Sequence, residues 1–204
     1  MDILYSLPGL LVAIVFHEFA HGYIAYLLGD DTAKNAGRLT LNPIKHLDLF
    51  GSVILPVLLT ILPGNFVLGW AKPVPYNPYN FKNKRLGELF VAAAGPLSNI
   101  LLALVFGLII RLAIYFNYAT AFISLALVIV LVNLVLAIFN SLPIPPLDGS
   151  KILFNLWPNF SPQIRLNLEK HGFVILLFFV LFLSKFLFPI ILFLTALLTG
   201  IPLA

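Results

Sequence analysis

Long apolar runs alternate with short polar segments along this chain. Three of the runs are long enough to cross a hydrocarbon core of about 30 Å, which takes about 20 helical residues, and they cover residues 3–28, 89–116 and 118–142. A further apolar run, residues 173–199, is interrupted by Lys185 and Pro189, so the pattern leaves open whether it crosses once or forms a hairpin. This pattern predicts an all-α polytopic membrane protein with about four transmembrane helices.

The segments between these runs predict shorter elements. Residues 50–62 form an apolar run of about 13 residues that contains Pro56, which favours a re-entrant segment over a full span. The Pro, Gly, Asn and aromatic content of residues 63–88 predicts a short β-strand or an extended loop. Closer to the C-terminus, Pro162 and Gly172 predict the first residue and the stop of a short interfacial helix.

The composition agrees with a single membrane-embedded domain. Hydrophobic residues make up 61% of the chain and charged residues 10%, whereas a soluble domain averages about 25% charged residues. We expect one domain over residues 1–204, with its core at about 3–157 and a C-terminal interfacial helix and transmembrane segment at about 161–199. The absence of cysteine excludes disulfides and thiolate metal ligands. In a membrane protein, the net charge of +4 does not indicate nucleic-acid binding.

The basic residues predict an orientation in the membrane. Of the 12 Lys and Arg residues, all but Arg111 and Lys185 lie in residues 29–49, 63–88 and 142–172. Because excess positive charge marks cytoplasmic loops, we expect these three segments on the cytoplasmic side. The N-terminus would then lie outside, and the first helix, with Gly29 as its stop, would run inward.

The stretch HEFAH places three ionisable side chains inside an apolar helix. On a helix, His17 and His21 lie on one face one turn apart, so both imidazoles can bind the same zinc ion. Glu18, which follows the first histidine, can reach a metal-bound water as a general base. The alternative is a pair of hydrogen-bonded histidines packed inside a helix bundle. A charged side chain at the centre of a span costs about 2.5–3.5 kcal/mol, which favours the functional interpretation.

A catalytic zinc needs a third protein ligand and an open position for water. The remaining candidates are His46, His171 and the acidic residues, among which Asp148 in the stretch LDG is the strongest. Asp148 also suits the N-cap of a short helix from about Gly149 to Trp157, which is the alternative interpretation. The predicted topology favours a ligand, because the inner end of the first helix and the residues that follow the 118–142 helix lie on the same side of the membrane.

Three motifs, in order along the chain, resemble the site-2 protease family of intramembrane zinc metalloproteases: HEFAH, AAAGPLSN at 92–99 and NSLPIPPLDG at 140–149. The stretches LTLNPIKHLDLFGSVILP and GWAKPVPYNP resemble the compact prokaryotic branch of that family. The resemblance implies one zinc ion held by His17, His21 and Asp148, with Glu18 as the catalytic base. It also implies cleavage of membrane-embedded segments of other proteins, near the cytoplasmic face of a prokaryotic cell membrane.

Four further polar residues are candidates for roles beside the zinc. Asn99 and Asn140 lie near the inner ends of their helices, where an amide can donate to the oxyanion of a tetrahedral intermediate or hold a substrate strand. Their alternative role is interhelical hydrogen bonding, typically worth less than about 2 kcal/mol. His46 and Asp48 are candidates for orienting a metal ligand, or for capping an interfacial turn.

The loop before the 89–116 helix is the candidate partner for a substrate strand. A protease must bind its substrate extended, because the peptide bonds of a helix are shielded, and strand addition to an exposed edge needs no particular sequence. The candidate residues are Gly69, Trp70, Ala71, Lys72, Pro73, Val74 and Pro75. The alternative is an interfacial aromatic anchor built from Trp70, Tyr76 and Tyr79, and both roles can hold together.

The sequence therefore predicts an intramembrane zinc metalloprotease that hydrolyses a peptide bond in or near the transmembrane segments of membrane proteins, as in regulated intramembrane proteolysis. The expected partners are a transmembrane protein or peptide substrate and the lipid bilayer, with no nucleic acid. The alternative function is a metal-ion transporter or metal-sensing membrane protein that uses the same ligands. Glu18 distinguishes the two functions, because a transport site has no need of a base next to its first ligand.

Overall fold

Helices form all of the regular structure in residues 3–54, 69–157 and 159–202, which are the residues that this computed structural model describes. The long helices are α1 (Ile3–Leu27), α4 (Lys84–Tyr115), α5 (Thr120–Asn140), α7 (Pro162–Phe178) and α8 (Ser184–Thr199). The short elements are α2 (Thr32–Asn35), η1 (Pro43–Lys45), η2 (Leu49–Ile54), η3 (Pro78–Asn80), α6 (Asp148–Leu156) and η4 (Phe179–Leu183). The predicted re-entrant segment lies mostly outside the described residues, and the described part of it falls in the π-helical turn η2.

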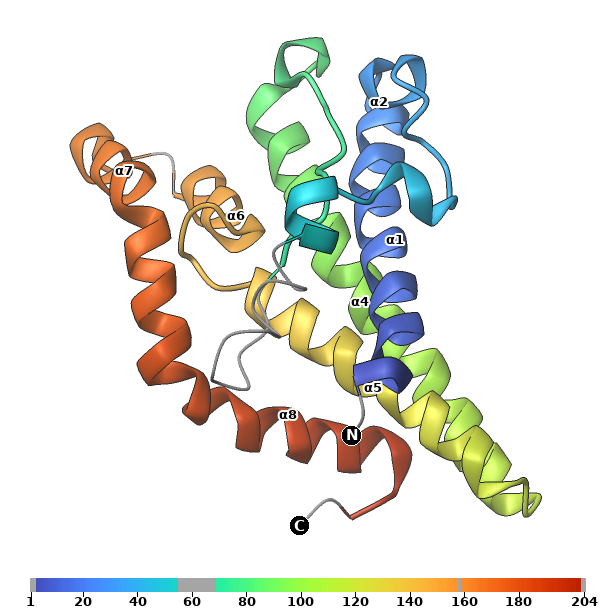
Figure 1. The fold of residues 1–204 in the computed structure, drawn as a ribbon. Helices are drawn as coiled ribbons and strands as arrows, with labels where there is room; N and C mark the ends of the chain where they lie inside the picture. The colour runs from blue at the N-terminus through green and yellow to red at the C-terminus, as the bar shows by residue number, and fades with distance from the viewer. Residues whose placement is uncertain (1–2, 55–68, 158, 203–204) are drawn as a thin grey trace.

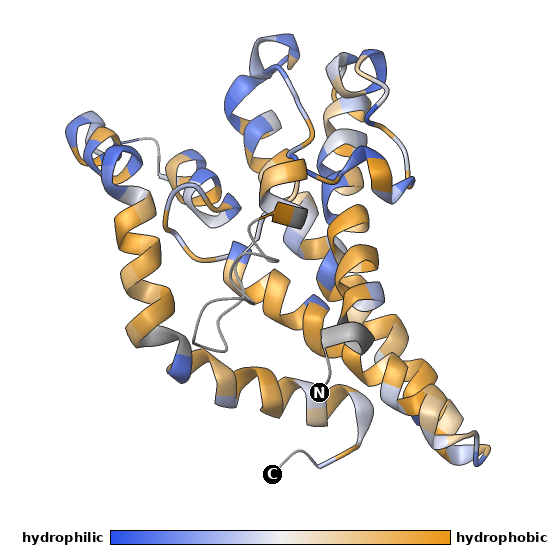
Figure 2. Cartoon of the chain, in the orientation of Figure 1, coloured by the Kyte–Doolittle hydropathy of each residue, from blue (hydrophilic) through white to orange (hydrophobic). Residues whose placement is uncertain are grey.

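Among the described residues, three helices are long and apolar enough to cross a membrane, namely α1 from Leu7 onward, α4 and α5. A fourth candidate span is a bent pair, in which Pro162–Phe182 and Lys185–Thr199 meet at 69°. Figure 2 shows hydrophobic residues along these helices and hydrophilic residues gathered at the end that carries α2 and the first turns of α4 and α7. The prediction of an all-α polytopic membrane protein is confirmed.

Helix α4 is the central support of the fold. It packs against α1, α5, α6 and α8, and α8 also lies against α5 (Figure 1). The buried residues between α4, α5 and α8 are mostly small or branched, and they are Ala103, Ile110, Ala126, Val130, Leu134 and Ile191. In lipid, helices associate through close van der Waals packing, which small residues permit. The elements that carry the polar motifs, α1 and α6, are therefore both fixed against one helix.

The ends of α1 and α4 follow from local sequence. Gly29, the predicted stop of the first helix, has φ +98°, a left-handed conformation that glycine adopts without the steric cost of a Cβ. Helix α4 begins at Lys84, earlier than the apolar pattern predicts, because the Asn83 side chain accepts a hydrogen bond from the Leu86 N–H and caps the helix.

The predicted helix stop at Gly172 is wrong, because α7 continues through this residue to Phe178. The predicted start is correct, with Ser161 at the N-cap and Pro162 in the first turn. A Cβ at Gly172 would collide with the carbonyl oxygen of Pro145, in the loop between α5 and α6. Gly172 therefore allows a close approach between α7 and that loop rather than ending the helix.

The predicted strand or extended loop is extended but forms no strand in the described residues. The Trp70 N–H donates to the Gly51 carbonyl at 3.1 Å, and the Lys72 N–H donates to the His46 carbonyl at 2.9 Å. Because alternate amides of an extended chain point to the same side, residues 46–51 hold one edge of this segment.

A buried carboxylate ties the extended segment to the end of α1. Asp30 is fully buried, and its Oδ2 accepts the Asn77 N–H at 2.7 Å. Its Oδ1 accepts the Asn80 Nδ2–H at 2.6 Å and two hydrogen bonds from Thr32. Burial acts to raise the pKa of Asp30, but these hydrogen bonds outweigh that effect and hold the pKa below its usual range. Asp30 is therefore an ionised connection between α1 and the residues that follow the extended segment.

Replacing Asp30 by Asn should destabilise the protein, because an amide cannot accept all the hydrogen bonds that the carboxylate accepts. Losing one hydrogen bond to a buried charged group costs about 1.5–3 kcal/mol of unfolding free energy, measurable as thermal unfolding in detergent. Because the pKa of Asp30 is lowered on folding, this stabilisation is complete above the unfolded pKa of about 3.9 and is lost as the pH falls through the folded value. The matched control is Asp31→Asn, which removes only an exposed ion pair with Lys34 at 3.7 Å. Equal effects of the two substitutions would contradict the connecting role of Asp30.

Candidate active site

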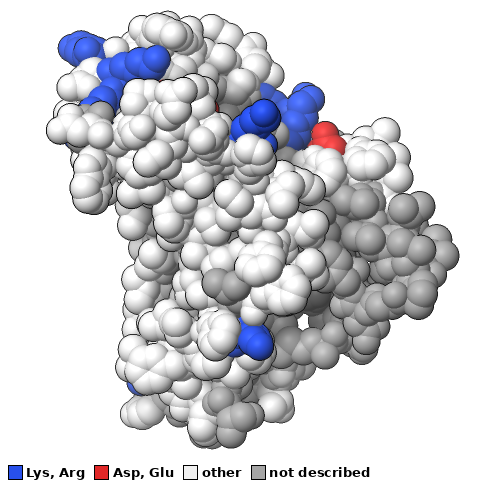
Figure 3. All heavy atoms as spheres, turned by 90° about the vertical axis from the view of Figure 1, so that its left-hand side faces the viewer, with Lys and Arg blue, Asp and Glu red and all other residues white. Residues whose placement is uncertain are grey.

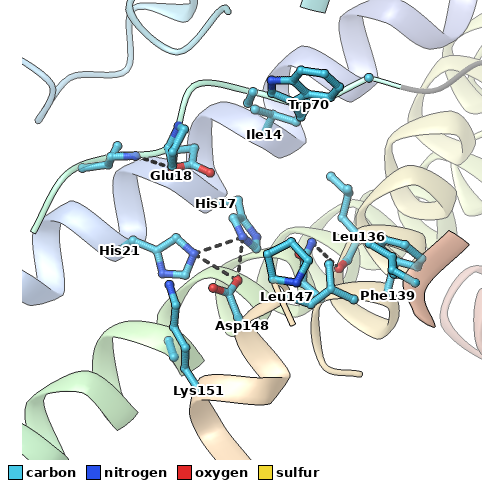
Figure 4. Close-up of a pocket in the computed structure, with 18 of the residues that line it drawn as sticks. Ile14, His17, Glu18, His21, Trp70, Leu136, Phe139, Leu147, Asp148 and Lys151 are labelled. Atoms are coloured by element: carbon cyan, nitrogen blue, oxygen red, sulfur yellow. Dashed lines mark hydrogen bonds and ion pairs between the residues drawn. The ribbon is translucent and has the colours of Figure 1, made fainter. Parts of the chain in front are cut away.

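Two imidazoles and one carboxylate meet between α1 and the first residue of α6. His17 Nε2 lies 3.1 Å from His21 Nε2 and 3.1 Å from Asp148 Oδ2, and His21 Nε2 lies 3.2 Å from the same oxygen. All three residues are at most 8% exposed. Figure 4 shows the three side chains pointing toward one another.

The separations in this triangle are close to those in the coordination sphere of a zinc ion. Zinc bonds to imidazole nitrogen and carboxylate oxygen are 2.0–2.2 Å long, so two ligands at the corners of a tetrahedron lie about 3.3–3.6 Å apart. The three observed separations are slightly shorter than this range. His17, His21 and Asp148 form the one group of at least three His, Asp or Glu side chains, within the described residues, whose ligand atoms lie close enough to hold a metal ion. The donor set and its spacing therefore fit zinc.

The hydrogen bonds behind the rings determine which nitrogens face the centre of the triangle. His17 Nδ1 lies 2.6 Å from Asn99 Oδ1, and His21 Nδ1 lies 2.7 Å from the Val91 carbonyl oxygen. Both partners are acceptors, so each Nδ1 carries a proton and each Nε2 presents a lone pair. Such hydrogen bonds fix the tautomer and ring orientation that a metal-binding histidine needs.

The centre of the triangle therefore collects three electron-pair donors. Two imidazole lone pairs and a carboxylate oxygen about 3 Å apart repel one another unless a cation lies between them. This arrangement favours a bound cation over a purely structural pair of histidines.

Two glycines make room for this cluster. A Cβ on Gly95 of α4 would lie 2.5 Å from His21 Nε2 and 2.6 Å from His17 Nε2, so any side chain there would enter the ligand triangle. A Cβ on Gly149 would collide with the carbonyl oxygens of Ser141 and Leu142 at the end of α5. The glycine after Asp148 therefore lets the first turn of α6 pack directly on the α5 backbone, which holds the carboxylate near the imidazoles.

Asp148 is the first residue of α6 rather than its N-cap. The N-cap position is Leu147, and no side chain caps the helix. The carboxylate of Asp148 points toward the two imidazoles instead. The geometry therefore matches the ligand interpretation of this residue and not the capping alternative.

A cavity of about 640 Å³ adjoins the cluster and is large enough for a small-molecule or peptide ligand. Glu18 lines it, and its Oε2 accepts the Val74 N–H at 2.8 Å. The extended segment forms another wall, through Gly69, Trp70, Ala71, Pro73, Val74 and Tyr76. Lys72 and Pro75 of the predicted substrate loop do not line the cavity. The predicted base and most of the predicted substrate loop thus share one cavity with the metal-binding group.

The two predicted oxyanion asparagines lie in different environments. Asn140 lines the cavity, with one amide N–H bonded to the Leu136 carbonyl of its own helix at 3.0 Å. Asn99 is fully buried behind His17, and its Nδ2 donates to the Ala13 carbonyl and to Asn133 Oδ1 at 3.0 and 2.8 Å. An oxyanion role needs a free donor in the cavity, and this geometry leaves Asn99 without one. Its contact with His17 places it behind the ligand.

His46 and Asp48 contact neither histidine of the cluster. His46 is buried, and its Nε2 lies 2.7 Å from the Thr40 carbonyl oxygen. Asp48 Oδ1 accepts the Gly51 N–H at 2.7 Å. These local hydrogen bonds match the interpretation of a turn rather than that of residues that orient a metal ligand. His171 is exposed on α7, and its Nδ1 lies 2.9 Å from the Asn167 carbonyl oxygen of the same helix.

The sequence analysis missed two residues that the structure connects to the site. Asn133 of α5 is fully buried and accepts the hydrogen bond from Asn99. The signal was present, because a polar side chain inside an apolar span favours a structural or functional partner. Lys151 lines the cavity one helical turn after Asp148, but a lone lysine after a turn gives no such signal.

Comparisons with known proteins place the chain in a family. The family model of peptidase family M50 matches residues 112–184. YwhC of Bacillus subtilis, which its name describes as a candidate zinc metalloprotease, is 43% identical over 189 residues, covering 88% of this chain and 80% of YwhC. Rip2 of Mycolicibacterium smegmatis, whose name also describes a candidate zinc metalloprotease, is 30% identical over 172 residues. The match covers 83% of this chain, and the chain spans 63% of the length of Rip2. No solved structure matches the chain significantly.

The identity to YwhC extends over most of both chains, and three helices in the part of the chain that the structure describes are suited to cross a membrane. The chain therefore belongs to peptidase family M50, the site-2 protease family, and is an integral membrane metalloprotease.

Proposed function

We propose that this protein is an intramembrane zinc protease, which hydrolyses a peptide bond in or near the transmembrane segments of membrane proteins. The observation that carries the proposal is that Glu18 and the His17–His21–Asp148 triangle line the same cavity. We also propose that residues 1–204 act as one domain, since α4 supports both halves of the site.

His17, His21 and Asp148 would hold one zinc ion, which when bound supplies a Lewis acid and lowers the pKa of a water toward 7. Glu18 takes a proton from the attacking water while the water oxygen bonds to the scissile carbonyl carbon. The carbonyl oxygen becomes an oxyanion. As the C–N bond breaks, Glu18 returns the proton to the leaving amine. The Val74 N–H keeps the carboxylate of Glu18 oriented within the cavity.

The extended segment is the proposed partner of an extended substrate. One of its edges is held by residues 46–51, whereas the Ala71 N–H donates to no partner among the described residues. Pro73 and Pro75 have no N–H, so a substrate strand would find one backbone donor here and would bind in one register. Asn140, which has a second amide N–H, is the proposed side-chain donor to the substrate or the oxyanion.

We further propose that the active site lies toward the cytoplasmic side. Figure 3 shows most of the visible Lys and Arg side chains gathered at one end of the molecule. This end carries α2 and the first turns of α4 and α7 (Figure 1). By the distribution of positive charge, that end faces the cytoplasm and the N-terminus of α1 faces outward.

A metal-ion transporter with the same ligands is the alternative function, and the family comparison does not favour it. Transport would require only the ligands, whereas Glu18 lies in the cavity without contributing to the triangle. The protease function therefore requires Glu18, whereas metal-ion transport does not.

Replacing Glu18 by Gln should lower the rate of peptide cleavage by a factor of about 10²–10⁴, the usual contribution of a general base. Bound zinc should remain at one ion per chain. The measurement is cleavage of a model transmembrane peptide by the purified protein, with and without a chelator, together with the metal content of each variant. Glu169→Gln, which removes an exposed ion pair with Arg165 at 2.8 Å, is the control that should keep full activity. If Glu18→Gln loses its zinc together with its activity, the transport function is favoured.

Replacing Asn99 by Ala should weaken zinc binding by a factor of about 10–100, the usual effect of removing the partner behind a metal-binding histidine. The His17 Nδ1–H would lose its acceptor, and the ring could then turn or change tautomer. The measurement is competition for zinc against a chelator of known affinity. Thr195→Ala is the control, because it removes a fully buried hydroxyl that bonds only within α8 and should leave zinc affinity unchanged. Unchanged affinity in Asn99→Ala would exclude the orienting role.

A further inference from the structure

We propose that Lys151 is a catalytic residue, whose ammonium group stabilises the negative charge that forms on the scissile carbonyl oxygen. This inference rests on the proposed function, since it assigns a role within the same cavity and reaction.

The position of Lys151 follows from the residue that supplies the third ligand. Asp148 is the first residue of α6, and Lys151 follows it at i+3, so the two side chains lie on neighbouring parts of one helix face. Lys151 is half-buried and lines the same cavity as His17, His21 and Glu18. Figure 4 shows the Lys151 side chain extending from α6 toward the ligand triangle, while Glu18 lies on the other side of the triangle.

Lys151 is held in place without being neutralised. Its Nζ lies 5.3 Å from the centre of the Tyr76 ring, a cation–π contact that orients the ammonium group. Within the described part of the chain, no carboxylate lies within ion-pairing distance of Lys151. Lys34 and Arg165, by contrast, are paired with Asp31 and Glu169.

Lys151 lines a cavity with a largely apolar lining, which includes Ile14, Leu136, Phe139 and Leu147. A charge in such surroundings loses hydration and is stabilised only by an opposite charge. Since no carboxylate of the described residues pairs with the Lys151 ammonium group, this group is available to an anion that forms in the cavity during the reaction.

The reaction moves negative charge away from Glu18 and toward the substrate. When the water oxygen bonds to the carbonyl carbon, one water proton goes to the carboxylate of Glu18, which becomes neutral. The π electrons of the C=O bond become a lone pair on the carbonyl oxygen, which is then the oxyanion. A cation on the side of the triangle away from Glu18 therefore stabilises the transition state more than the ground state, which is the requirement for catalysis.

A structural role is the competing explanation, because the contact with Tyr76 also joins α6 to the extended segment. The chain offers a matched comparison. Lys84 Nζ lies 4.2 Å from the centre of the Tyr79 ring, a similar contact outside the cavity. If the contact itself were what mattered, Lys84→Met and Lys151→Met would have similar effects.

The experiment uses the full-length protein in detergent with the variants Lys151→Met, Lys151→Gln, Lys151→Arg and Lys84→Met. For each one, kcat and KM are measured on a model transmembrane peptide, along with zinc content. A second arm titrates a phosphinic peptide, an anionic mimic of the tetrahedral intermediate, into Glu18→Gln with and without Lys151→Met. This second arm needs no turnover, so it tests Lys151 separately from the proposed protease activity.

Removing one oxyanion-stabilising group usually lowers kcat by a factor of about 10²–10³. We expect this loss for Lys151→Met and Lys151→Gln, with KM and zinc content unchanged, and phosphinic peptide binding weakened to a similar extent. Lys151→Arg should recover much of the loss, and Lys84→Met should match the wild type. Unchanged phosphinic peptide affinity, or a loss of zinc or folding in both neutral variants, would overturn the proposal. If the wild type binds the phosphinic peptide through Lys151 but cleaves no peptide, the protease function fails and the catalytic role of Lys151 fails with it, and Lys151 is only an anion-binding residue of the cavity.

Discussion

The structure depends on bringing three electron-pair donors to one point inside an apolar helix bundle. The imidazole nitrogens of His17 and His21 and a carboxylate oxygen of Asp148 lie 3.1–3.2 Å apart, although Asp148 is 131 residues from His17 along the chain. Such a group is unfavourable by itself, because the donors repel one another and are removed from water. A bound cation attracts all three donors and takes the place of the water that they have lost. The surrounding helices hold the donors around the position of that cation.

Helix α4 provides most of this support. It supplies an acceptor behind each imidazole, through Asn99 and the Val91 carbonyl, and it approaches the rings closely because Gly95 has no side chain. On the far side, Asp30 connects the end of α1 to the residues after the extended segment, and that segment contacts Glu18 through the Val74 N–H. The ligands, the proposed base and the proposed substrate strand partner are thus fixed by separate contacts around one cavity.

The sequence predicted features that are encoded locally. The glycine at position 29 predicted the end of α1, and the long apolar runs predicted that the chain is helical. Helix periodicity predicted that His17 and His21 lie on one face of α1. Features that depend on contact between distant segments were missed. Gly172 has the sequence signature of a helix stop, yet it serves a close approach to Pro145. Asn99 carries the same amide as Asn140, and only the packing of α4 against α1 places it behind His17 instead of in the cavity.

The central claim is that both imidazoles and the carboxylate bind one zinc ion. The most direct test is zinc X-ray absorption spectroscopy on the purified protein and on Asp148→Ala. The account predicts one zinc per chain with two imidazole nitrogens at about 2.0–2.1 Å and oxygen ligands at about 2.0–2.2 Å, and one fewer protein oxygen ligand with weaker binding in the variant. Zinc that binds without imidazole ligands, or with the same affinity and ligand set in Asp148→Ala, would contradict it.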